Sequence, residues 1–195
     1  MRDVAKAAKD WPQLNFIVYH GGYRYAGGGR AEDAWAQFER SGRVDWITDL
    51  ADIPANHGVK NVYADVGQLF AQTTMAEPRL AAVMMGQLIA GLGVDHVCWG
   101  TDAIWTGSPQ WQIEALRRLE IPEALQKRHG FAPLGPADGP VKRAIFGDNN
   151  ARLYNVRPQQ RAELLTDKLA EYRALYDRHG AGRTNLAYGY ARKTA

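Results

Sequence analysis

The stretch VDHVCWGTDAIW, residues 94–105, decides how this sequence of 195 residues is interpreted. Residues 94–99 form a short apolar and β-branched run, which is typical of a strand buried in a parallel sheet, and Gly100 ends it. Asp102 therefore follows a strand directly. In sheets whose strands alternate with helices, ligands bind at the carboxyl ends of the strands, so this position makes Asp102 a candidate functional residue. The alternative is an ordinary turn that Thr101 or Asp102 caps.

Two more runs have the character of buried strands. Residues 14–19 (LNFIVY) lead directly to His20, and residues 60–66 (KNVYADV) place Asp65 near the end of the run. Each of the three runs is followed by helical spacing. This alternation predicts an α/β fold with parallel strands, in which His20 and Asp102 both stand at strand ends.

Apolar spacing and helix punctuation predict the remaining elements. The expected helices cover residues 2–9, 31–40, 44–55, 77–92, 108–119, 121–130, 141–146 and 158–177. The segment GQLFAQTT, residues 67–74, is expected to be a loop. Gly147 is expected to close the short helix before it, and Asn149 or Asn150 to cap the turn that follows. The last helix is amphipathic, with Leu165, Leu169, Tyr172 and Tyr176 on one face, and a basic tail follows it.

The composition is that of an ordinary globular protein large enough for one core, with 46% hydrophobic and 23% charged residues. No apolar run is long enough for a membrane helix, and the N-terminus lacks the apolar core of a signal peptide. The single cysteine, Cys98, lies inside a predicted strand, so a buried thiol and a cytoplasmic setting are expected. The formal charge of +3 comes from residues 157–195, where basic and acidic residues are interspersed, so we expect neither nucleic-acid nor membrane binding.

The glycine-rich segment 21–30 (GGYRYAGGGR) matches neither the phosphate-binding loop nor the dinucleotide fingerprint, which excludes a nucleotide site of either type. A mobile loop over a pocket is one interpretation, in which Arg24 binds a substrate carboxylate with two hydrogen bonds. A solvated surface loop is the other. Tyr23, Arg24 and Trp105 are the candidate residues for a pocket wall.

The five histidines differ in their surroundings. His57, His129 and His179 each precede a glycine at a predicted helix end, where a histidine can meet the last carbonyl groups. His96 begins a strand, on the side opposite the candidate site. His20 alone follows a strand, and with Asp102 it could bind a divalent metal, zinc first. Two ligands are too few, because a catalytic zinc normally has three protein ligands, and the sequence has no His-x-His.

Four segments in this order, NFIVYHGGY, NVYADVG, VCWGTDAIW and IFGDNNARLY, resemble the closing half of the amidohydrolase-2 family. This family includes aminocarboxymuconate-semialdehyde decarboxylase and related hydrolases. The resemblance spans residues 14–156 and implies the C-terminal half of a distorted (β/α)8 (TIM) barrel, with strands roughly five to eight in residues 1–156 and an extra helix and basic tail in 157–195.

The resemblance also implies a chemistry for the two candidate residues. His20 corresponds to the metal-binding histidine that ends the fifth strand. Asp102 corresponds to the aspartate that ends the eighth strand, touches the metal and transfers protons. The implied activity is a metal-dependent hydrolase that acts on a small organic substrate through an activated water, with zinc as the expected metal. Decarboxylation without oxidation is the alternative, but decarboxylases place a histidine after the NVYADVG strand, where this chain has Asp65 or Gln68.

A complete barrel of this type has about 250 residues, and a half barrel leaves strand edges open. We therefore expect the chain to form a homo-oligomer or to pair with a complementing N-terminal half-barrel. The alternative outside enzymes is a folded module without catalysis of its own, whose chemistry depends on a partner chain. Its substrate is beyond prediction, because specificity in this fold resides in variable loops.

Overall fold

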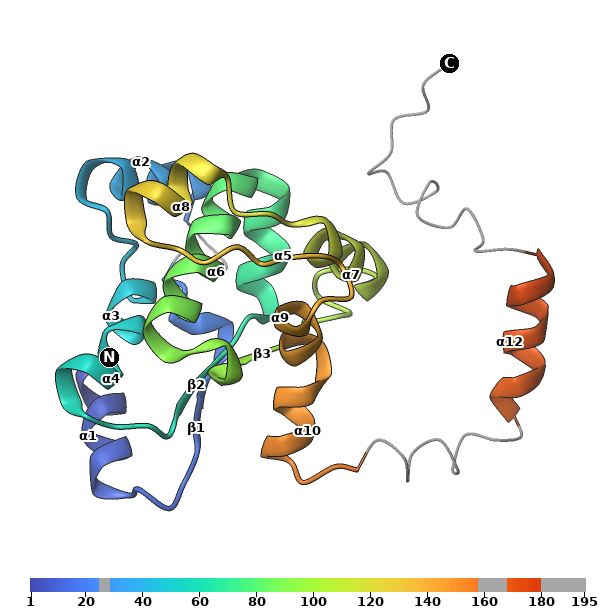
Figure 1. Cartoon of the computed structure of the whole chain (residues 1–195), viewed down its shortest axis with the longest axis horizontal. Coiled ribbons are helices and arrows are strands. Elements are labelled where there is room, and N and C mark those ends of the chain that lie inside the picture. The colour runs from blue at the N-terminus through green and yellow to red at the C-terminus, as the bar shows by residue number, and fades with distance from the viewer. Residues whose placement is uncertain (25–28, 158–167, 180–195) are drawn as a thin grey trace. The chain divides into compact units, whose positions relative to one another are not determined.

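The computed structural model describes residues 1–24, 29–157 and 168–179 (Figure 1). The chain divides into two compact units, Met1–Leu153 and Tyr154–Ala195. The first unit contains the sheet, the hydrophobic core and both residues that the sequence places at strand ends.

The sheet consists of three parallel strands in the order β1 (Phe16–Val18), β2 (Val62–Asp65) and β3 (Val97–Cys98). Each of the three predicted strands is present but shorter than its apolar run. Val62, Tyr63 and Ala64 of the central strand are buried, whereas the residues of β1 are only half-buried. The described residues therefore form a partial α/β fold with a parallel sheet, as the sequence indicates, while a half barrel stays a prediction.

Helices account for most of the remaining described residues (Figure 1). In the first unit they are α1 (Arg2–Asp10), α2 (Ala31–Ser41), α3 (Ile47–Ala51), α4 (Ile53–His57), α5 (Gly67–Ala76), α6 (Pro78–Leu92), α7 (Pro109–Arg118), α8 (Glu123–His129), α9 (Pro140–Arg143) and α10 (Asn149–Leu153), with 3-10 turns η1 (Tyr19–Gly22) and η2 (Val94–His96) and the π-helical turn η3 (Ala144–Asp148).

Helix α6 is the central element of the core. Its sequence is apolar around nearly the whole circumference, and it packs against α3, α5 and the strands. The Glu77 side chain caps its start by accepting a hydrogen bond from the Arg79 amide, and Pro78 stands in the first turn, where a missing amide costs nothing. The sequence predicts this helix correctly because cap, proline and apolar run agree.

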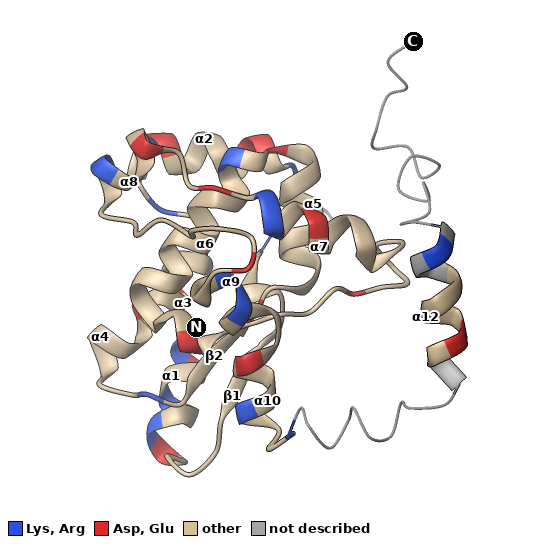
Figure 2. Cartoon of the chain, turned by 45° about the vertical axis from the view of Figure 1, so that its right-hand side comes forward, with Lys and Arg blue, Asp and Glu red and all other residues tan. Residues whose placement is uncertain are grey.

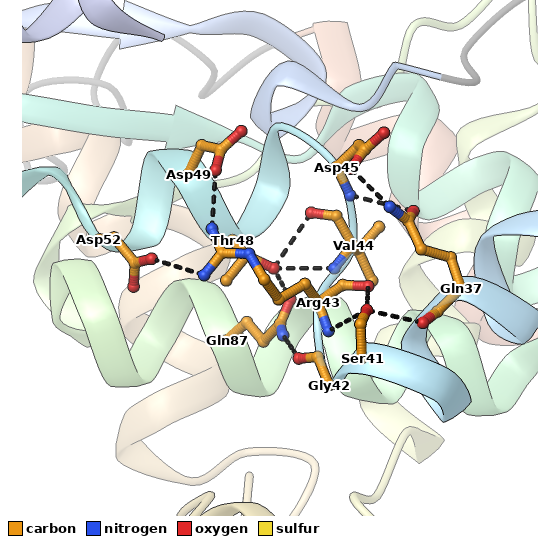
Figure 3. A network of polar contacts seen from close by, with 10 residues as sticks. All are labelled: Gln37, Ser41, Gly42, Arg43, Val44, Asp45, Thr48, Asp49, Asp52 and Gln87. Carbon is orange, nitrogen blue, oxygen red and sulfur yellow. Dashed lines mark hydrogen bonds and ion pairs between the residues drawn. The ribbon is translucent and has the colours of Figure 1, made fainter.

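A polar network holds the turn between α2 and α3 against α6 (Figure 3). Arg43 binds both Asp49 and Asp52, and Thr48 donates to the side chain of Gln87, which in turn donates to the carbonyl of Gly42. The helical spacing predicted over residues 44–55, with a break at Pro54, forms two short helices, α3 and α4, which meet at Asp52, and Pro54 lies in the first turn of α4.

The strand predicted over residues 94–99 is only a third as long as expected. Val94–His96 form the 3-10 turn η2, and only Val97 and Cys98 pair with β2. The reason lies in Gly93, whose φ of 97° turns the chain out of α6, after which the amide of His96 bonds the Gly93 carbonyl. Apolar character alone could not separate this turn from the strand.

The segment 67–74 is helical, so the prediction of a loop there was wrong. Two threonines make this segment resemble a loop, but in α5 their hydroxyls bond carbonyls one turn earlier: Thr73 donates to Leu69 and Thr74 to Phe70. Leu69 and Phe70 are fully buried. Burial therefore outweighs the weak helix preference of threonine.

Residues 140–153 run continuously through α9, η3 and α10, so Gly147 does not end a helix. Asn149 and Asn150 were expected to cap the next turn, and both instead bind strand β3 and its flanks. The amide of Asn149 donates to the carbonyls of Val94 (2.8 Å) and Val97 (2.7 Å), and Asn150 donates to Trp99 (2.9 Å). The asparagines fasten this helix to the sheet rather than begin a helix.

In the second unit the structure describes residues 154–157 and helix α12 (Lys168–His179). The first half of the helix predicted over 158–177 lies outside the described residues, as do Leu165 and the side chains of Leu169 and Tyr176; Tyr172 is exposed. In the view of Figure 2, basic and acidic positions are interspersed over the helices, and pairs such as Glu123–Lys127 join them. Within the described part of the chain, no helix combines the length and the apolar character that crossing a membrane requires.

Candidate functional site

His20 stands in a left-handed turn that follows β1. Its φ is 57°, and Gly21 and Gly22 continue with φ values of 54° and 71°. Gly21 is buried, and a Cβ there would lie 3.1 Å from Leu69 and 3.3 Å from Ile47, so both the conformation and the space call for glycine. The His-Gly-Gly sequence thus forms a tight turn that places the imidazole, partly exposed, at the carboxyl end of β1.

Asp102 also has a left-handed backbone, with φ 49°, in the loop after β3. The side chain of Gln112, a fully buried residue of α7, holds this loop in place through hydrogen bonds. Its amide donates to the carbonyl of Thr101 (2.8 Å) and to the hydroxyl of Thr106 (2.8 Å), which itself donates to the Thr101 carbonyl (2.7 Å). Non-glycine residues rarely adopt positive φ, and such positions concentrate at functional sites.

The structure brings the two predicted residues together. Nδ1 of His20 lies 3.2 Å from Oδ2 of Asp102, although strand β2 separates the strands that carry them. About a third of each side chain is exposed. The backbone amide of Gln68 also points at Nδ1, at 3.1 Å. An unprotonated Nδ1 accepts this bond, whereas an Nδ1 that carries a hydrogen donates it to Asp102, so the two contacts belong to different hydrogen positions on the ring.

Asp65 completes a group of three polar side chains at the strand ends. Burial of its carboxyl group is the largest effect on its pKa, the nearby charge of Asp102 adds to it, and together they raise the pKa to about 6. The charge of His20 and hydrogen bonds from the backbone amides of Gly67 and His20 oppose this rise. The site therefore holds a carboxyl group that changes its charge near neutral pH.

The donor types at this site fit a divalent transition metal, because imidazole nitrogen and carboxylate oxygen are the ligands that zinc and related metals prefer. Their number is insufficient. Among the described residues, no three His, Cys, Asp or Glu side chains are grouped so that they could hold a metal ion. His20 and Asp102 would thus supply two ligands of a set that needs at least one more.

The other three predicted site residues lie in different surroundings. Tyr23 is buried in the core, with 5% of its surface exposed. Arg24 forms an ion pair with Asp45 at 3.0 Å and is 59% exposed. Trp105 is 87% exposed, three residues after Asp102. The structure brings His20 and Asp102 together, and the backbone amide of Tyr23 donates to the His20 carbonyl (2.8 Å) within the same turn.

The remaining histidines of the first unit have structural surroundings. His57 and His129 end α4 and α8, and the following glycines have the left-handed conformation that closes a helix. Nε2 of His96 lies 2.9 Å from the carbonyl of Lys60, and its ring stacks on Tyr63. Cys98 is buried, as predicted, and burial raises the pKa of its thiol to about 11.

A family model described as amidohydrolase matches residues 1–156. This is well over half of the chain, and it covers the sheet, the His20 turn and the Asp102 loop. The chain belongs to the amidohydrolase-2 family. No curated protein and no solved structure gave a significant match. The family is generally enzymatic and typically depends on a metal, which agrees with the donor types at the strand ends of this amidohydrolase.

Sequence reasoning did not single out Asp65 as a site residue in this amidohydrolase. A signal was present, because Asp65 is the last residue of the central strand and interrupts its alternation. What the sequence could not show is that Gly67 and Gly100 leave room for its carboxylate beside His20. That arrangement depends on the register of three strands far apart in the sequence.

Proposed function

We propose that this amidohydrolase is a metal-dependent hydrolase of a small organic substrate, in which His20 and Asp102 bind the metal and Asp102 is also the base. The observation that carries the proposal is the 3.2 Å approach of Nδ1 of His20 to Oδ2 of Asp102 from two non-adjacent strands. The metal would be divalent, with zinc as the first candidate, and it would polarise a carbonyl group and lower the pKa of a bound water.

The chain's own residues have distinct parts in this proposal. When Nδ1 of His20 carries the proton and donates it to Asp102, the unprotonated Nε2 would be free to face a metal. Asp102 is a third exposed and can accept a proton from a water molecule. Arg24 would bind a substrate carboxylate, with Asp45 released, and Tyr23 and Trp105 would contribute to the pocket wall. Hydrolysis is favoured over decarboxylation because the end of the central strand carries Asp65, followed by Gln68, where decarboxylases of the family place a histidine.

The test is the metal content of the purified chain, measured by plasma mass spectrometry. We expect near-stoichiometric metal in the wild type and its loss in His20→Ala and Asp102→Asn. Matched controls are His57→Ala, which changes an exposed histidine at a helix end, and Asp138→Asn, which changes a surface carboxylate paired with Arg117. Metal that survives both site variants, or a wild-type chain that binds none, would contradict the proposal and favour a module without catalysis of its own.

The missing ligand suggests a partner. We propose that β1, which is an edge strand of the described sheet and only half-buried, is covered by a second copy of the chain or by a complementing half-barrel that supplies the further ligand. Light scattering coupled to size-exclusion chromatography tests this. A metal-loaded monomer of 21.7 kDa would show that the chain needs no partner for its site.

A further inference from the structure

Asp65 lies where the two proposed ligands meet. It ends β2, the central strand, between the strands that lead to His20 and to Asp102. The backbone amides of His20 and Gly67 act on its carboxylate and favour the charged form. Because one of these amides belongs to the left-handed residue itself, Asp65 contacts the turn at the point where its conformation is unfavourable.

Two glycines make room for this carboxylate. A Cβ on Gly67 would lie 2.8 Å from Oδ1 of Asp65 and 2.8 Å from Nδ1 of His20. A Cβ on Gly100 would lie 2.7 Å from Oδ1 of Asp65 and 2.8 Å from its Cγ. Neither glycine has a left-handed backbone, so space rather than conformation requires glycine there. Both glycines therefore form a cradle for Asp65.

We propose that Asp65 is a positioning residue that fixes the left-handed turn of His20 and thereby aims the imidazole at Asp102. The expected effect on metal affinity rests on the proposed function. The expected effect on the His20 turn does not, because it concerns the chain without metal. A left-handed conformation is unfavourable for a residue other than glycine, and the interaction of the Asp65 side-chain oxygens with the His20 amide opposes this cost.

The proposal separates two properties of the Asp65 side chain, its acceptor oxygens and its charge. Asp65→Ala removes both, whereas Asp65→Asn keeps one acceptor oxygen in the same place. Gly100→Ala leaves Asp65 intact but fills its cradle. Gly147→Ala is the matched control, because a Cβ at that glycine meets nothing within 4 Å.

The direct measurement is the nitrogen NMR spectrum of the His20 imidazole in the metal-free full chain, assigned with His20→Ala. We expect Asp65→Ala and Gly100→Ala to move the His20 ring signals away from the wild-type positions, and Asp65→Asn and Gly147→Ala to keep them close. Unmoved His20 signals in folded Asp65→Ala would overturn the proposal. If Asp65→Ala does not fold, unmoved signals in Gly100→Ala would overturn it.

The second measurement is the affinity for Zn²⁺ alone, by competition with a chelating dye. Residues that orient a ligand typically change metal affinity about 10–100-fold, so we expect at least a tenfold loss in Asp65→Ala and less than a threefold loss in Asp65→Asn. An Asp65→Ala chain that keeps wild-type affinity would contradict the positioning role. If wild-type chain binds no Zn²⁺ while the His20 signals move as expected, the proposed function fails and the positioning role stands.

Discussion

The two ends of the same sheet use polar side chains in opposite ways. At the amino end, Asn149 donates to the carbonyls of Val94 and Val97. The side-chain amide of Asn61 lies within hydrogen-bond distance of three carbonyls that precede β1, those of Ala8 in α1, Trp11 and Leu14. At the carboxyl end, His20 lies 3.2 Å from Asp102, the charges of both act on Asp65, and His20 and Asp102 have left-handed backbones. At the amino end, the polar side chains provide hydrogen bonds to backbone carbonyl groups. At the carboxyl end, two polar residues have unfavourable backbone conformations, which is typical of functional sites.

The same difference separates two histidines. His96, before β3, lies within hydrogen-bond distance of Asp95 and of a carbonyl, and stacks on Tyr63 with ring centroids 4.4 Å apart. His20, after β1, shares one nitrogen between an amide and a carboxylate. The presence of a histidine therefore does not indicate a functional site by itself. Its position before or after a strand is more informative, because active sites in parallel α/β folds lie at the carboxyl ends of the strands.

The largest effect on stability is expected at the amino end. Asn149→Ala should lower the free energy of unfolding by about 3 kcal/mol, because one buried and one partly buried carbonyl group lose their donor and a cavity is left. Denaturant unfolding measures this. Asn150→Ala, which removes one bond from a half-buried side chain, is the control and should cost about 1 kcal/mol. Equal effects of the two variants would mean that Asn149 does not anchor the sheet.

The next largest effect is a pH dependence of stability that Asp65 causes at the carboxyl end of the sheet. Since the pKa of Asp65 is raised from 3.8 to about 6 in the folded state, the folded chain holds this proton more tightly than the unfolded chain. The protonated Asp65 carboxyl therefore makes its full contribution to stability below pH 3.8, and this contribution is lost as the pH rises through 6. Up to about 1.4 kcal/mol is lost per pH unit in this window, and partial solvent contact reduces the total to about 2 kcal/mol.

Asp65→Asn should remove this dependence. The variant should match the wild type near pH 4 and exceed its stability by about 2 kcal/mol at pH 8, measured by urea unfolding across the range. Asp138→Asn, on the surface, controls for the loss of a carboxylate elsewhere. A stability difference that does not change with pH would show that the Asp65 carboxyl is not destabilised by its surroundings.

The sequence predicts the parts of this molecule in which local and global preferences agree. The three strands, the capped helix α6 and the positions of His20 and Asp102 follow from apolar runs and the residues that end them. The helix α5 and the turn η2 do not, because burial of Leu69 and Phe70 and the φ of Gly93 decide them. Asp65 and Gln112 were missed as site residues for the same reason. Their roles come from contacts across the sequence that a linear pattern does not contain.

A smaller effect is expected from Gln112, the buried amide at the carboxyl end. Gln112→Leu removes two hydrogen bonds to the Asp102 loop, but it also removes Oε1, which has no hydrogen-bond partner among the described residues. The net loss in unfolding free energy should be about 1 kcal/mol, less than for Asn149. Hydrogen exchange of amides 101–107 should accelerate at the same time. Gln110→Leu, on the exposed side of α7, should change neither.

The smallest effect has the opposite sign. Asp102→Gly should raise the free energy of unfolding by about 0.5–1 kcal/mol, because glycine adopts the φ of 49° without the cost that a side chain incurs. Thermal unfolding measures the gain, and the same variant should lose the proposed metal binding. Asn155→Gly relieves a similar left-handed residue, φ 52°, in the second unit and should leave metal binding intact. Destabilisation by Asp102→Gly would mean that the Asp102 side chain holds its loop together, and the carboxyl end of the sheet would then resemble the amino end.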